Sequence, residues 1–527
     1  MEPSNLYKVL ITTSGVGSRL GEITDYTNKS LVIVGDKPAI SHIIENYPIE
    51  IGIVVTLGYF GNHVQEYLEL CYPDRSFEFI NVQKYQGSGS SLAFSILQAK
   101  ESLNCKFIYH ACDTLIPGEI LSVPSRNWVG GFRSTDATNY ASYDVSGTQV
   151  KRFHKKGMTE FDFLHIGIVG IVDYDEFWNE LQLLVNENSE DSSLNDVSVV
   201  GSLILKGSKF YSNEFKNWVD IGNSNSLTVA RKILGKNQHV LHKTQESVSF
   251  IQNSVIKFFA DSKIVKNRVL RAKYLQDCIP EIEGVTPHFY RYKYEEGQLA
   301  ASINNPNLIN ELLNWANKNL WTVSKMDTPN DFDKVCHEFY INKTNTRLEN
   351  FFETRGIKDE VNIINGVEVP NIKTLISDAE HLILKSPRIS RFHGDFILDN
   401  IIKTKDGFKL IDWRQDFGSS IELGDMYYDL SKLNHSLHVS HEIVNQNLFF
   451  ISENEGLVEC GIKRKDVHVI MENYLEKFAL AQGLDILKIK VITSLIWLNM
   501  SPLHHHPFDM FLFYYGKINL WRALNEI

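Results

Sequence analysis

The fold of the N-terminal half is decided by residues 8–20, Lys-Val-Leu-Ile-Thr-Thr-Ser-Gly-Val-Gly-Ser-Arg-Leu. The first six residues form an apolar, β-branched run, which predicts a strand over residues 8–13. Gly15 and Gly17 come directly after it, and glycine lets the backbone N–H groups of such a turn approach an anion. A tight turn needs glycine for steric reasons as well, so the glycines alone do not establish an anion site.

Further along the chain, short β-branched runs alternate with amphipathic segments. We expect strands over residues 8–13, 51–57, 77–82 and 107–111, and helices over residues 39–46, 63–70 and 91–100. This alternation favours an α/β fold with a mostly parallel sheet covered on both faces. In such a fold a nucleotide site lies at the carboxyl ends of the strands.

The length of 527 residues predicts two or three domains. The helical pattern near Leu227 is lost at residues 235–238, and polar residues continue to about 245, so we predict domains over 1–238 and 246–527. Beyond this boundary we expect strands over 247–251, 254–259 and 288–294, a helix over 266–276 and mainly helical sequence to the end. Few strands followed by many helices predict an α+β second domain.

The composition is that of a globular chain, with 43% apolar and 22% charged residues. A net charge of −11 argues against a wide nucleic-acid surface, but it does not exclude pockets that bind nucleotides.

The six cysteines are scattered and predict reduced thiols. No signal peptide and no run of about 20 apolar residues are visible, so we expect a cytoplasmic protein without a transmembrane segment. The sequence does not predict an oligomeric state.

Two cations follow the glycines. Arg19 comes two residues after Gly17, and Lys29 lies in Asn-Lys-Ser-Leu, residues 28–31. Two cations beside a cradle of backbone amides suit a triphosphate whose pyrophosphate must leave.

These elements resemble the sugar-phosphate nucleotidyltransferases, whose signature reads roughly L-A-A-G-x-G-T-R-L, then P-K-x-L, then K-P. The resemblance covers about residues 7–235 and includes Gly-Ser-Gly-Ser-Ser-Leu at 87–92, Asp113 after a strand, and Trp-Val-Asp-Ile-Gly at 218–222. It implies a Rossmann-like, GT-A-like domain that uses Mg²⁺ and a nucleoside triphosphate, CTP, UTP, GTP or dTTP. The residue roles it implies are nucleotide binding by Gly15, Gly17, Ser18, Gly87 and Ser88, catalysis by Arg19 and Lys29, and metal binding by Asp113 and Asp220.

Some positions depart from this signature. The family's Glu-Lys-Pro is replaced by His154-Lys155-Lys156, in which Lys155 is the candidate for the substrate phosphate and a solvated basic turn is the equal alternative. Thr13 and Ser14 replace the family's two alanines, so the resemblance leaves the base open. Asp113 taken alone is typical of a helix N-cap, and its context favours the metal role.

A second motif lies at residues 390–400, Ser-Arg-Phe-His-Gly-Asp-Phe-Ile-Leu-Asp-Asn, followed by Ile-Asp-Trp at 411–413. It resembles the aminoglycoside phosphotransferase and choline kinase superfamily, whose fold is protein-kinase-like and whose substrate is ATP. The resemblance implies that Asp395 orients or deprotonates the acceptor hydroxyl and that Asn400 and Asp412 bind Mg²⁺.

The flanking sequence extends this second resemblance. Lys257 on an apolar strand matches the lysine that touches the nucleotide phosphates, with a snorkelling surface lysine as the alternative. Glu296 matches the nucleotide-binding hinge, and Asp425 is expected to brace the catalytic loop. Residues 245–253 contain no glycine, and the helix predicted over 266–276 has no glutamate to pair with Lys257.

Together the two motifs predict a bifunctional enzyme. The kinase would phosphorylate a small hydroxylated metabolite, with a sugar favoured, and the nucleotidyltransferase would convert this phosphate to a nucleotide-activated product for surface polysaccharide synthesis. The alternatives are a choline or ethanolamine kinase joined to a cytidylyltransferase, and a nucleotide-binding regulatory protein with a silent kinase domain.

Overall fold

The computed structural model describes residues 7–235, 244–323, 331–454 and 456–525. The chain forms two compact units, Met1–Val265 with Glu283–Tyr292, and Lys266–Ile282 with Lys293–Ile527. The first unit therefore extends past the predicted boundary at 238–246, part of which lies outside the described residues.

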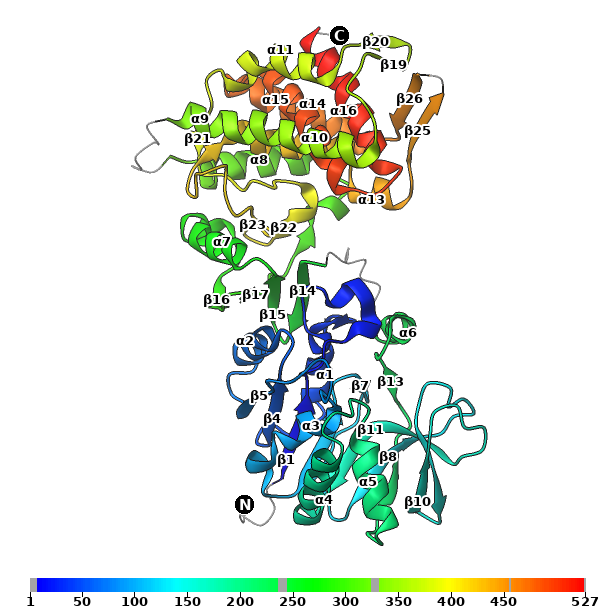
Figure 1. The fold of residues 1–527 in the computed structure, drawn as a ribbon. Helices are drawn as coiled ribbons and strands as arrows, with labels where there is room; N and C mark the ends of the chain where they lie inside the picture. The colour runs from blue at the N-terminus through cyan, green and yellow to red at the C-terminus, as the bar shows by residue number, and fades with distance from the viewer. Residues whose placement is uncertain (1–6, 236–243, 324–330, 455, 526–527) are drawn as a thin grey trace. The chain divides into compact units, whose positions relative to one another are not determined.

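The first unit alternates strands and helices as the sequence predicts (Figure 1). Its strands are β1 (Lys8–Thr12), β2 (Ile33–Val34), β3 (Lys37–Pro38), β4 (Gly52–Leu57), β5 (Phe77–Asn81), β6 (Phe107–Ala111), β7 (Thr114–Leu115), β8 (Trp128–Phe132), β9 (Ser142–Ser146), β10 (Gln149–His154), β11 (Phe163–Ile171), β12 (Tyr211–Glu214), β13 (Val219–Asp220), β14 (Glu246–Ile251), β15 (Ser254–Phe259), and most of β16 (Ile282–Val285) and β17 (Phe289–Lys293). Its α-helices are α1 (Ala39–Ile44), α2 (Gly61–Cys71), α3 (Leu92–Leu97), α4 (Tyr174–Glu187), α5 (Asp196–Leu205) and α6 (Ser224–Leu234).

The main sheet has nine strands in the order β5-β4-β1-β6-β11-β8-β12-β10-β9. The strands predicted over residues 8–111 pair in parallel, with Leu10 of β1 opposite Val54 of β4 and Tyr109 of β6. Beyond β6 the sheet is mixed, because β11 runs antiparallel to both β6 and β8. The prediction of a mostly parallel sheet is therefore wrong for this later half, where the predicted alternation of strands and helices had already ended.

Both faces of the sheet are covered, as the alternation along β1 requires. Val9 and Ile11 are buried in one core together with residues of α1, α2 and α6. Leu10, which points to the opposite face, is buried in a second core with residues of α3, α4 and α5.

A four-stranded sheet, β14-β15-β17-β16, packs against α2 in the first unit. Phe258 and Phe289 are buried in the core that contains α2, and the Phe289 ring lies 5.7 Å from the Tyr67 ring. The Glu66 carboxylate accepts hydrogen bonds from the backbone N–H of His288 at 2.9 Å and from its ring at 3.0 Å. These contacts explain why strands predicted to open the second domain belong to the first compact unit.

The second unit is mainly helical. Its α-helices are α7 (Ser262–Leu275), which begins in the first unit, α8 (Asn307–Asn319), α9 (Phe332–His337), α10 (Lys343–Arg355), α11 (Ile372–Leu384), α12 (Met426–His438), α13 (His441–Asn445), α14 (Asp466–Ala481), α15 (Ile486–Met500) and α16 (Phe508–Leu524). Its strands are β18 (Gln298–Leu299), β19 (Asn362–Ile364), β20 (Val367–Val369), β21 (Ile389–Ser390), β22 (Ile401–Thr404), β23 (Gly407–Leu410), β24 (Gly424–Asp425), β25 (Phe449–Asn454) and β26 (Leu457–Ile462).

One segment of this unit, Ile486–Leu503, is long and apolar enough to cross a membrane by length and composition. In the structure 61% of it is buried, and α15 packs against α12 and α16. The apolar character of the segment is thereby accounted for by its place in the core of the unit.

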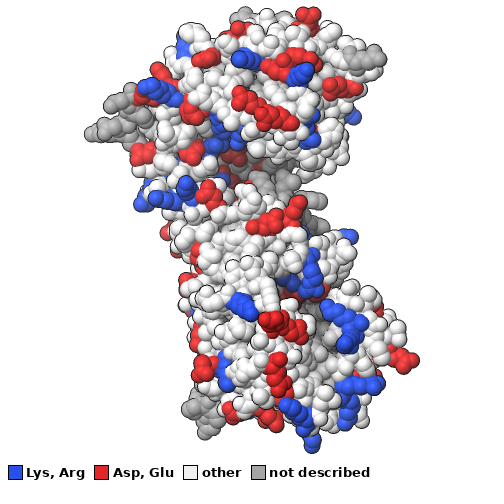
Figure 2. All heavy atoms as spheres, in the orientation of Figure 1, with Lys and Arg blue, Asp and Glu red and all other residues white. Residues whose placement is uncertain are grey.

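Basic and acidic side chains of the described residues are interspersed on the face drawn in Figure 2. Among these residues, no single-sign field therefore dominates this face.

Two candidate catalytic centres

In the first unit, Asp113 and Asp220 meet at the end of β6. Asp113 comes two residues after that strand, and β13 pairs antiparallel with β7 so that Asp220 lies opposite Thr114. A Cβ atom on Gly222 would lie 2.9 Å from the Asp220 Oδ1 atom and 3.5 Å from the Asp113 Oδ2 atom. The absence of a side chain at Gly222 therefore leaves room between two carboxylates that come from distant parts of the sequence.

Lys29 and Arg19 face the same carboxylate. The Lys29 Nζ atom is 2.6 Å from Asp113 Oδ2, and the Arg19 guanidinium is 4.0 Å from it. Burial would lower the pKa of Lys29, but the attraction of Asp113 outweighs it and raises that pKa. Burial would in turn raise the pKa of Asp113, and Lys29 holds it below its usual range. Both groups are therefore charged at neutral pH.

Asp220 has a further partner that sequence reasoning missed. Its Oδ1 atom accepts a hydrogen bond from the Gly222 N–H at 3.0 Å, and its Oδ2 atom accepts one from the Tyr140 hydroxyl at 3.1 Å. The Tyr140 ring packs edge-on against Trp218 at 4.9 Å. Tyr140 thus orients the second carboxylate, and a lone tyrosine before β9 gives no sequence signal of this role.

The glycine-rich turn lies beside these charged groups. Gly17 adopts a left-handed conformation with φ 72°, and a Cβ atom there would lie 3.0 Å from the Lys29 Cβ atom. Gly15 has no atom within 4 Å of a Cβ position, and Ser18 begins a 3₁₀ helix, Ser18–Thr24. The turn therefore passes close to Lys29 while leaving space at Gly15.

Asn28 holds this turn in place and is completely buried. Its amide nitrogen donates to the carbonyls of Thr13 at 2.8 Å and Tyr59 at 2.6 Å, and its oxygen accepts from the Ser30 N–H at 2.9 Å and from the Ser30 hydroxyl at 2.8 Å. The signature that this half resembles has a proline at this position, and a proline side chain could not make these hydrogen bonds.

Asn28→Ala should destabilise the first unit by about 2–4 kcal/mol, because it leaves buried carbonyl and N–H groups without partners. Urea unfolding checks this, with the exposed Asn104→Ala as the control. Equal midpoints for the two variants contradict it.

The other predicted residues of this half lie in turns. Gly87 adopts φ 85°, and the Ser88 hydroxyl donates to the Glu190 carbonyl at 3.3 Å. Lys155 is exposed after β10, where both the phosphate role and the solvated-turn alternative remain open.

The donor set of the first centre fits Mg²⁺. Among the described residues, no group of three or more His, Cys, Asp or Glu side chains is arranged to hold a metal ion alone. Two carboxylates suit Mg²⁺ that takes its remaining ligands from substrate phosphates and water. Asp113 and Asp220 are the residues that would hold it.

In the second unit, Asp395 and Asn400 are in contact. The Asn400 amide donates to the Asp395 backbone carbonyl and to its Oδ2 atom, each at 3.0 Å. The Lys432 ammonium lies 2.7 Å from Asp395 Oδ1. Burial would raise the pKa of Asp395, but Lys432 holds it well below its usual range. Asp395 is thus an ionised acceptor suited to orienting a hydroxyl.

Asp412 follows β23 in a left-handed conformation with φ 58°, which costs a non-glycine residue about 1–2 kcal/mol. Two bonds join its loop to the Asp395 loop, because His393 Nε2 bonds to the Ile411 carbonyl at 2.9 Å and the Arg414 N–H donates to the His393 carbonyl at 3.0 Å. Arg268 lies 3.6 Å from Asp412 Oδ1. The three predicted residues therefore lie on two joined loops, and Asn400 and Asp412 are the candidates to hold Mg²⁺.

The carboxylate that braces the loop before Asp395 is Asp429, and the expectation for Asp425 is wrong. The backbone N–H groups of His393 and Gly394 donate to Asp429 at 2.8 and 2.7 Å, and the Trp321 indole donates at 3.0 Å. Asp425 instead caps α12 and accepts from the Arg388 N–H at 2.9 Å. The two acids lie one helical turn apart, so they face neighbouring parts of the structure.

Burial, opposed by these hydrogen bonds, raises the pKa of Asp429 to about 6. Because this pKa is raised above the unfolded value of about 4, protonated Asp429 contributes its full stabilisation to the fold below pH 4. This stabilisation is lost as the pH rises through 6 and the buried carboxyl ionises. Asp429→Asn should therefore destabilise the second unit by about 2 kcal/mol more at pH 4.5 than at pH 7. Urea unfolding at the two pH values measures this difference, and equal losses contradict it.

The two remaining kinase-like candidates come from other elements. Lys257 is buried in β15 of the first unit, and Glu296 lies between β17 and β18, where the chain has entered the second unit. Their nucleotide-binding roles remain predictions.

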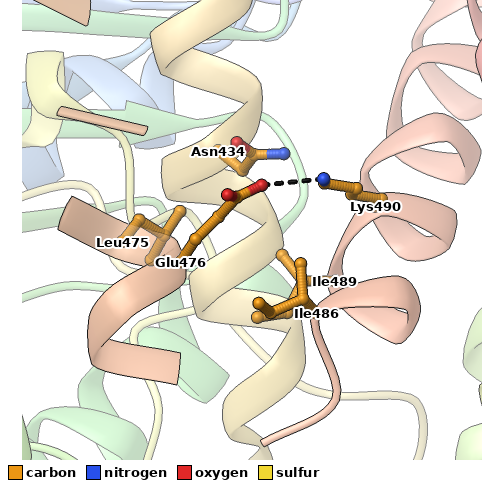
Figure 3. Close-up of a pocket in the computed structure, with 6 residues that line it drawn as sticks. All are labelled: Asn434, Leu475, Glu476, Ile486, Ile489 and Lys490. Atoms are coloured by element: carbon orange, nitrogen blue, oxygen red, sulfur yellow. Dashed lines mark ion pairs between the residues drawn. The ribbon is translucent and has the colours of Figure 1, made fainter. Parts of the chain in front are cut away.

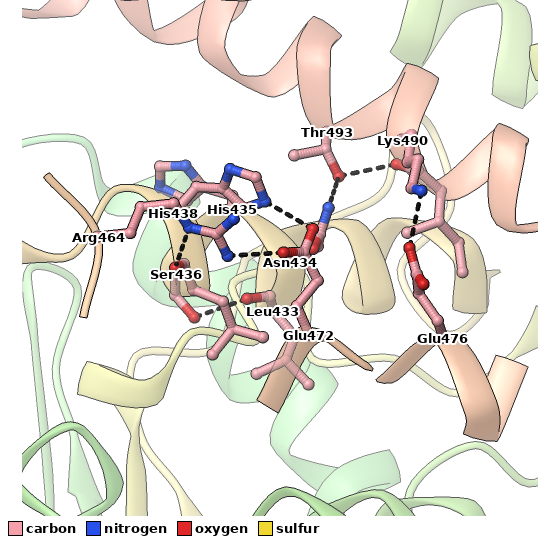
Figure 4. Close-up of polar contacts among 12 residues, drawn as sticks. Leu433, Asn434, His435, Ser436, His438, Arg464, Glu472, Glu476, Lys490 and Thr493 are labelled. Carbon is pink, nitrogen blue, oxygen red and sulfur yellow. Dashed lines mark hydrogen bonds and ion pairs between the residues drawn. The ribbon is translucent and has the colours of Figure 1, made fainter. Parts of the chain in front are cut away.

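Other polar groups of the second unit hold helices together. Glu472 pairs with His438 at 2.8 Å and with Arg464 at 2.7 Å (Figure 4). A small pocket between α12, α14 and α15 is crossed by the Glu476–Lys490 ion pair at 2.7 Å (Figure 3). The lining of this pocket contains no predicted site residue, and we assign both features to packing.

Comparisons with known proteins bear on the N-terminal half. No protein-family profile matches the chain. The "Probable glucose-1-phosphate cytidylyltransferase" of Bacillus subtilis is 26% identical over 150 residues, 28% of this chain and 53% of that protein. The "Bifunctional protein GlmU" of Methanococcus vannielii is 25% identical over 240 residues, 43% of this chain and 55% of that protein. The chain thus spans about half the length of the curated relatives it matches.

Among solved structures, the CTP:phosphocholine cytidylyltransferase of Streptococcus pneumoniae is 20% identical, with a TM-score of 0.37, over 44% of this chain and 99% of that one. The sequence matches relate the N-terminal half to sugar nucleotidyltransferases. They do not extend to the kinase-like prediction for the C-terminal half.

Proposed function

We propose that the first unit transfers a nucleotidyl group from a nucleoside triphosphate to a small phosphorylated metabolite and releases pyrophosphate. The observation that carries this proposal is the meeting of Asp113 and Asp220 beside Lys29 and the glycine-rich turn. The sequence similarity to a cytidylyltransferase supports it.

The mechanism follows from where the charges lie. A phosphate oxygen of the acceptor attacks the α-phosphorus in line, and the bond to the pyrophosphate oxygen breaks. Lys29, charged and buried, and Arg19, exposed beside it, stabilise the negative charge of the departing pyrophosphate. Asp113 and Asp220 would hold Mg²⁺, which would neutralise charge on the α-phosphate, and the Tyr140 hydroxyl fixes the Asp220 carboxylate.

The second unit is proposed to phosphorylate a hydroxylated metabolite with ATP. Asp395 is ionised and positioned by Asn400 and Lys432, so it can orient the acceptor hydroxyl toward the γ-phosphorus. The hydroxyl oxygen forms the new P–O bond, ADP leaves, and the hydroxyl proton passes to Asp395 or to solvent. The product is a phosphate ester, which is the type of substrate the first unit needs. The two steps in sequence would give an activated metabolite for glycan synthesis, and a cytoplasmic location remains a prediction.

The deciding experiment is mass spectrometry of the products made by the full chain from a metabolite extract with Mg²⁺ and ATP, CTP, UTP, GTP and dTTP. We expect a nucleotide conjugate together with pyrophosphate. A separate panel of sugar phosphates, phosphocholine and phosphoethanolamine with each triphosphate identifies the acceptor of the first unit. Release of no pyrophosphate from any pair excludes the nucleotidyltransferase. Pyrophosphate release without ATP-dependent phosphorylation of any extract component leaves the second unit as a silent kinase domain.

A further inference from the structure

Two cationic side chains approach one aromatic ring near the second centre. The Lys343 Nζ atom lies 4.3 Å from the Phe339 ring centroid, and the Arg414 guanidinium carbon lies 5.1 Å from it. Phe339 itself is buried and stacks on Phe417 at 4.1 Å. Because this ring is fixed by packing, it holds both cations near one point.

Two further cations complete what we call the Lys343 cluster, defined as Lys343, Arg347, Arg414 and Lys432. Arg347 follows Lys343 by one turn of α10, so both lie on the same side of that helix, and it donates to the Asn499 carbonyl at 3.1 Å. Lys432 projects from α12 to Asp395. The cluster therefore reaches from α10 to the carboxylate predicted to orient the acceptor.

The charges in this cluster are only partly compensated. Arg414 donates to the Asp416 carbonyl at 3.0 Å and lies 3.8 Å from its carboxylate, and Lys432 pairs with Asp395. Lys343 has the Phe339 ring beside it. Its strongest charge interactions are repulsive ones with Arg414, Arg347 and Lys432, followed by attraction to Asp416. Burial and these repulsions lower the pKa of Lys343 to about 6, so Lys343 is largely neutral near pH 7 without a ligand, and a bound anion would restore its charge.

Crowding half-buried cations is unfavourable for folding, so a bound anion is the simplest compensation. Neutral side chains at these positions would pack α10 equally well, so packing alone does not require the charges. A choline or ethanolamine acceptor, which is a cation, would add to the repulsion. A neutral sugar would leave the charges as they are.

We propose that the Lys343 cluster binds a carboxylate or phosphate group on the phosphoryl acceptor, so that the second unit acts on a hydroxylated anion. This inference rests on the proposed phosphotransferase function and names its substrate class. The contact between Lys432 and Asp395 places the anionic group beside the hydroxyl that receives the phosphoryl group. Lys343 and Arg347 are the specificity residues, since Lys343 lies over the Phe339 ring and Arg347 donates to the Asn499 carbonyl, so both are held on α10 apart from the carboxylate of Asp395.

The test uses the full chain with Mg²⁺ and a non-hydrolysable ATP analogue, so that the nucleotide phosphates do not compete as probes. Calorimetry measures the binding of glycerate, gluconate, glycerol 3-phosphate and glucose 6-phosphate against glycerol, glucose, choline and ethanolamine. We expect some of the anions to bind at least about tenfold more tightly than their neutral counterparts, and Lys343→Gln to weaken that binding by about 10- to 100-fold. ADP formation with ATP and the same compounds is measured in parallel.

Matched variants separate charge from folding. Lys343→Arg keeps the charge and should retain binding, and Lys373→Gln removes an exposed lysine on α11 and should change nothing. If Lys343→Gln unfolds, Arg347→Gln with Arg347→Lys as its control replaces it. The urea-unfolding midpoint of the second unit reports that each variant is folded, and pyrophosphate release reports that the first unit is intact.

Each outcome decides one point. Anion binding that depends on Lys343, together with ADP formation from an anion, supports the inference. The same binding without ADP formation from any compound upholds the anion site and overturns the phosphotransferase. Two results overturn the inference while the phosphotransferase stands. In the first, a neutral or cationic acceptor is phosphorylated and Lys343→Gln leaves its rate unchanged. In the second, Lys343→Gln changes only the KM for ATP. Absence of Lys343-dependent binding for all the anions also overturns it.

Discussion

Asp113→Asn should lower the rate of pyrophosphate release by about 10³-fold or more, because it removes a metal-binding charge and the partner of Lys29. Asparagine keeps the shape of the side chain, whereas alanine would also open a gap beside a buried ammonium group. Either substitution leaves Lys29 without its ionic partner and is expected to destabilise the first unit by about 3 kcal/mol, but asparagine adds no gap, so we prefer it. A coupled assay for pyrophosphate with a sugar phosphate and each nucleoside triphosphate measures the effect.

The controls for this variant lie in both units. Asp74→Asn removes an exposed carboxylate of the first unit and should leave the rate unchanged. ATP-dependent phosphorylation by the second unit should also be unaffected. Because Lys29 holds the pKa of Asp113 low, Asp113 should remain ionised as the pH falls to about 5. Wild-type pyrophosphate release by Asp113→Asn would assign this cluster to folding alone.

Asp395→Ala should abolish ATP-dependent phosphorylation, with a loss of about 10³-fold or more, while pyrophosphate release continues. The carboxylate is the group proposed to orient the acceptor hydroxyl, and its loss also leaves Lys432 without its partner. ADP formation in the presence of the metabolite extract is the direct readout. Asp395→Asn keeps the volume and should be similarly inactive, because a neutral amide does not accept a proton from the hydroxyl.

Asp399→Asn is the matched control for this loop. Asp399 lies four residues after Asp395, is half-buried and pairs with His441 at 3.3 Å. We expect near wild-type phosphorylation from it. If Asp395→Ala and Asp399→Asn both form ADP at the same rate as the wild type, Asp395 has no catalytic role and the second unit is left with a binding role.

The sequence predicted the central part of the first unit because its information is local there. The run at residues 8–13 predicts β1, and the placement of Asp113 after β6 follows directly from a strand pattern. The resemblance also named Asp220, and the structure brings it next to Asp113 through the pairing of β13 with β7. That pairing depends on two-residue strands, which no periodicity could reveal.

Other residues could not be predicted because their roles arise from tertiary contacts. Asp425 and Asp429 occupy equivalent-looking positions in one short segment, and only the packing of α12 shows which of them meets the His393 and Gly394 N–H groups. Tyr140 and Lys343 lie in segments without a motif. The sequence also assigned β14 and β15 to the second domain, since it contains no signal that Phe258 packs with residues of α2.

The small sheet on α2 has a consequence for how such a protein can evolve. A recombination event at residues 238–246 would remove Ile256, Phe258 and Phe289 from the core of the first unit and expose apolar surface on both products. Each half would then reach the cell as an aggregation-prone fragment. The two proposed activities are therefore expected to be inherited as one gene with a fixed one-to-one stoichiometry, and not to be exchanged as separate domains.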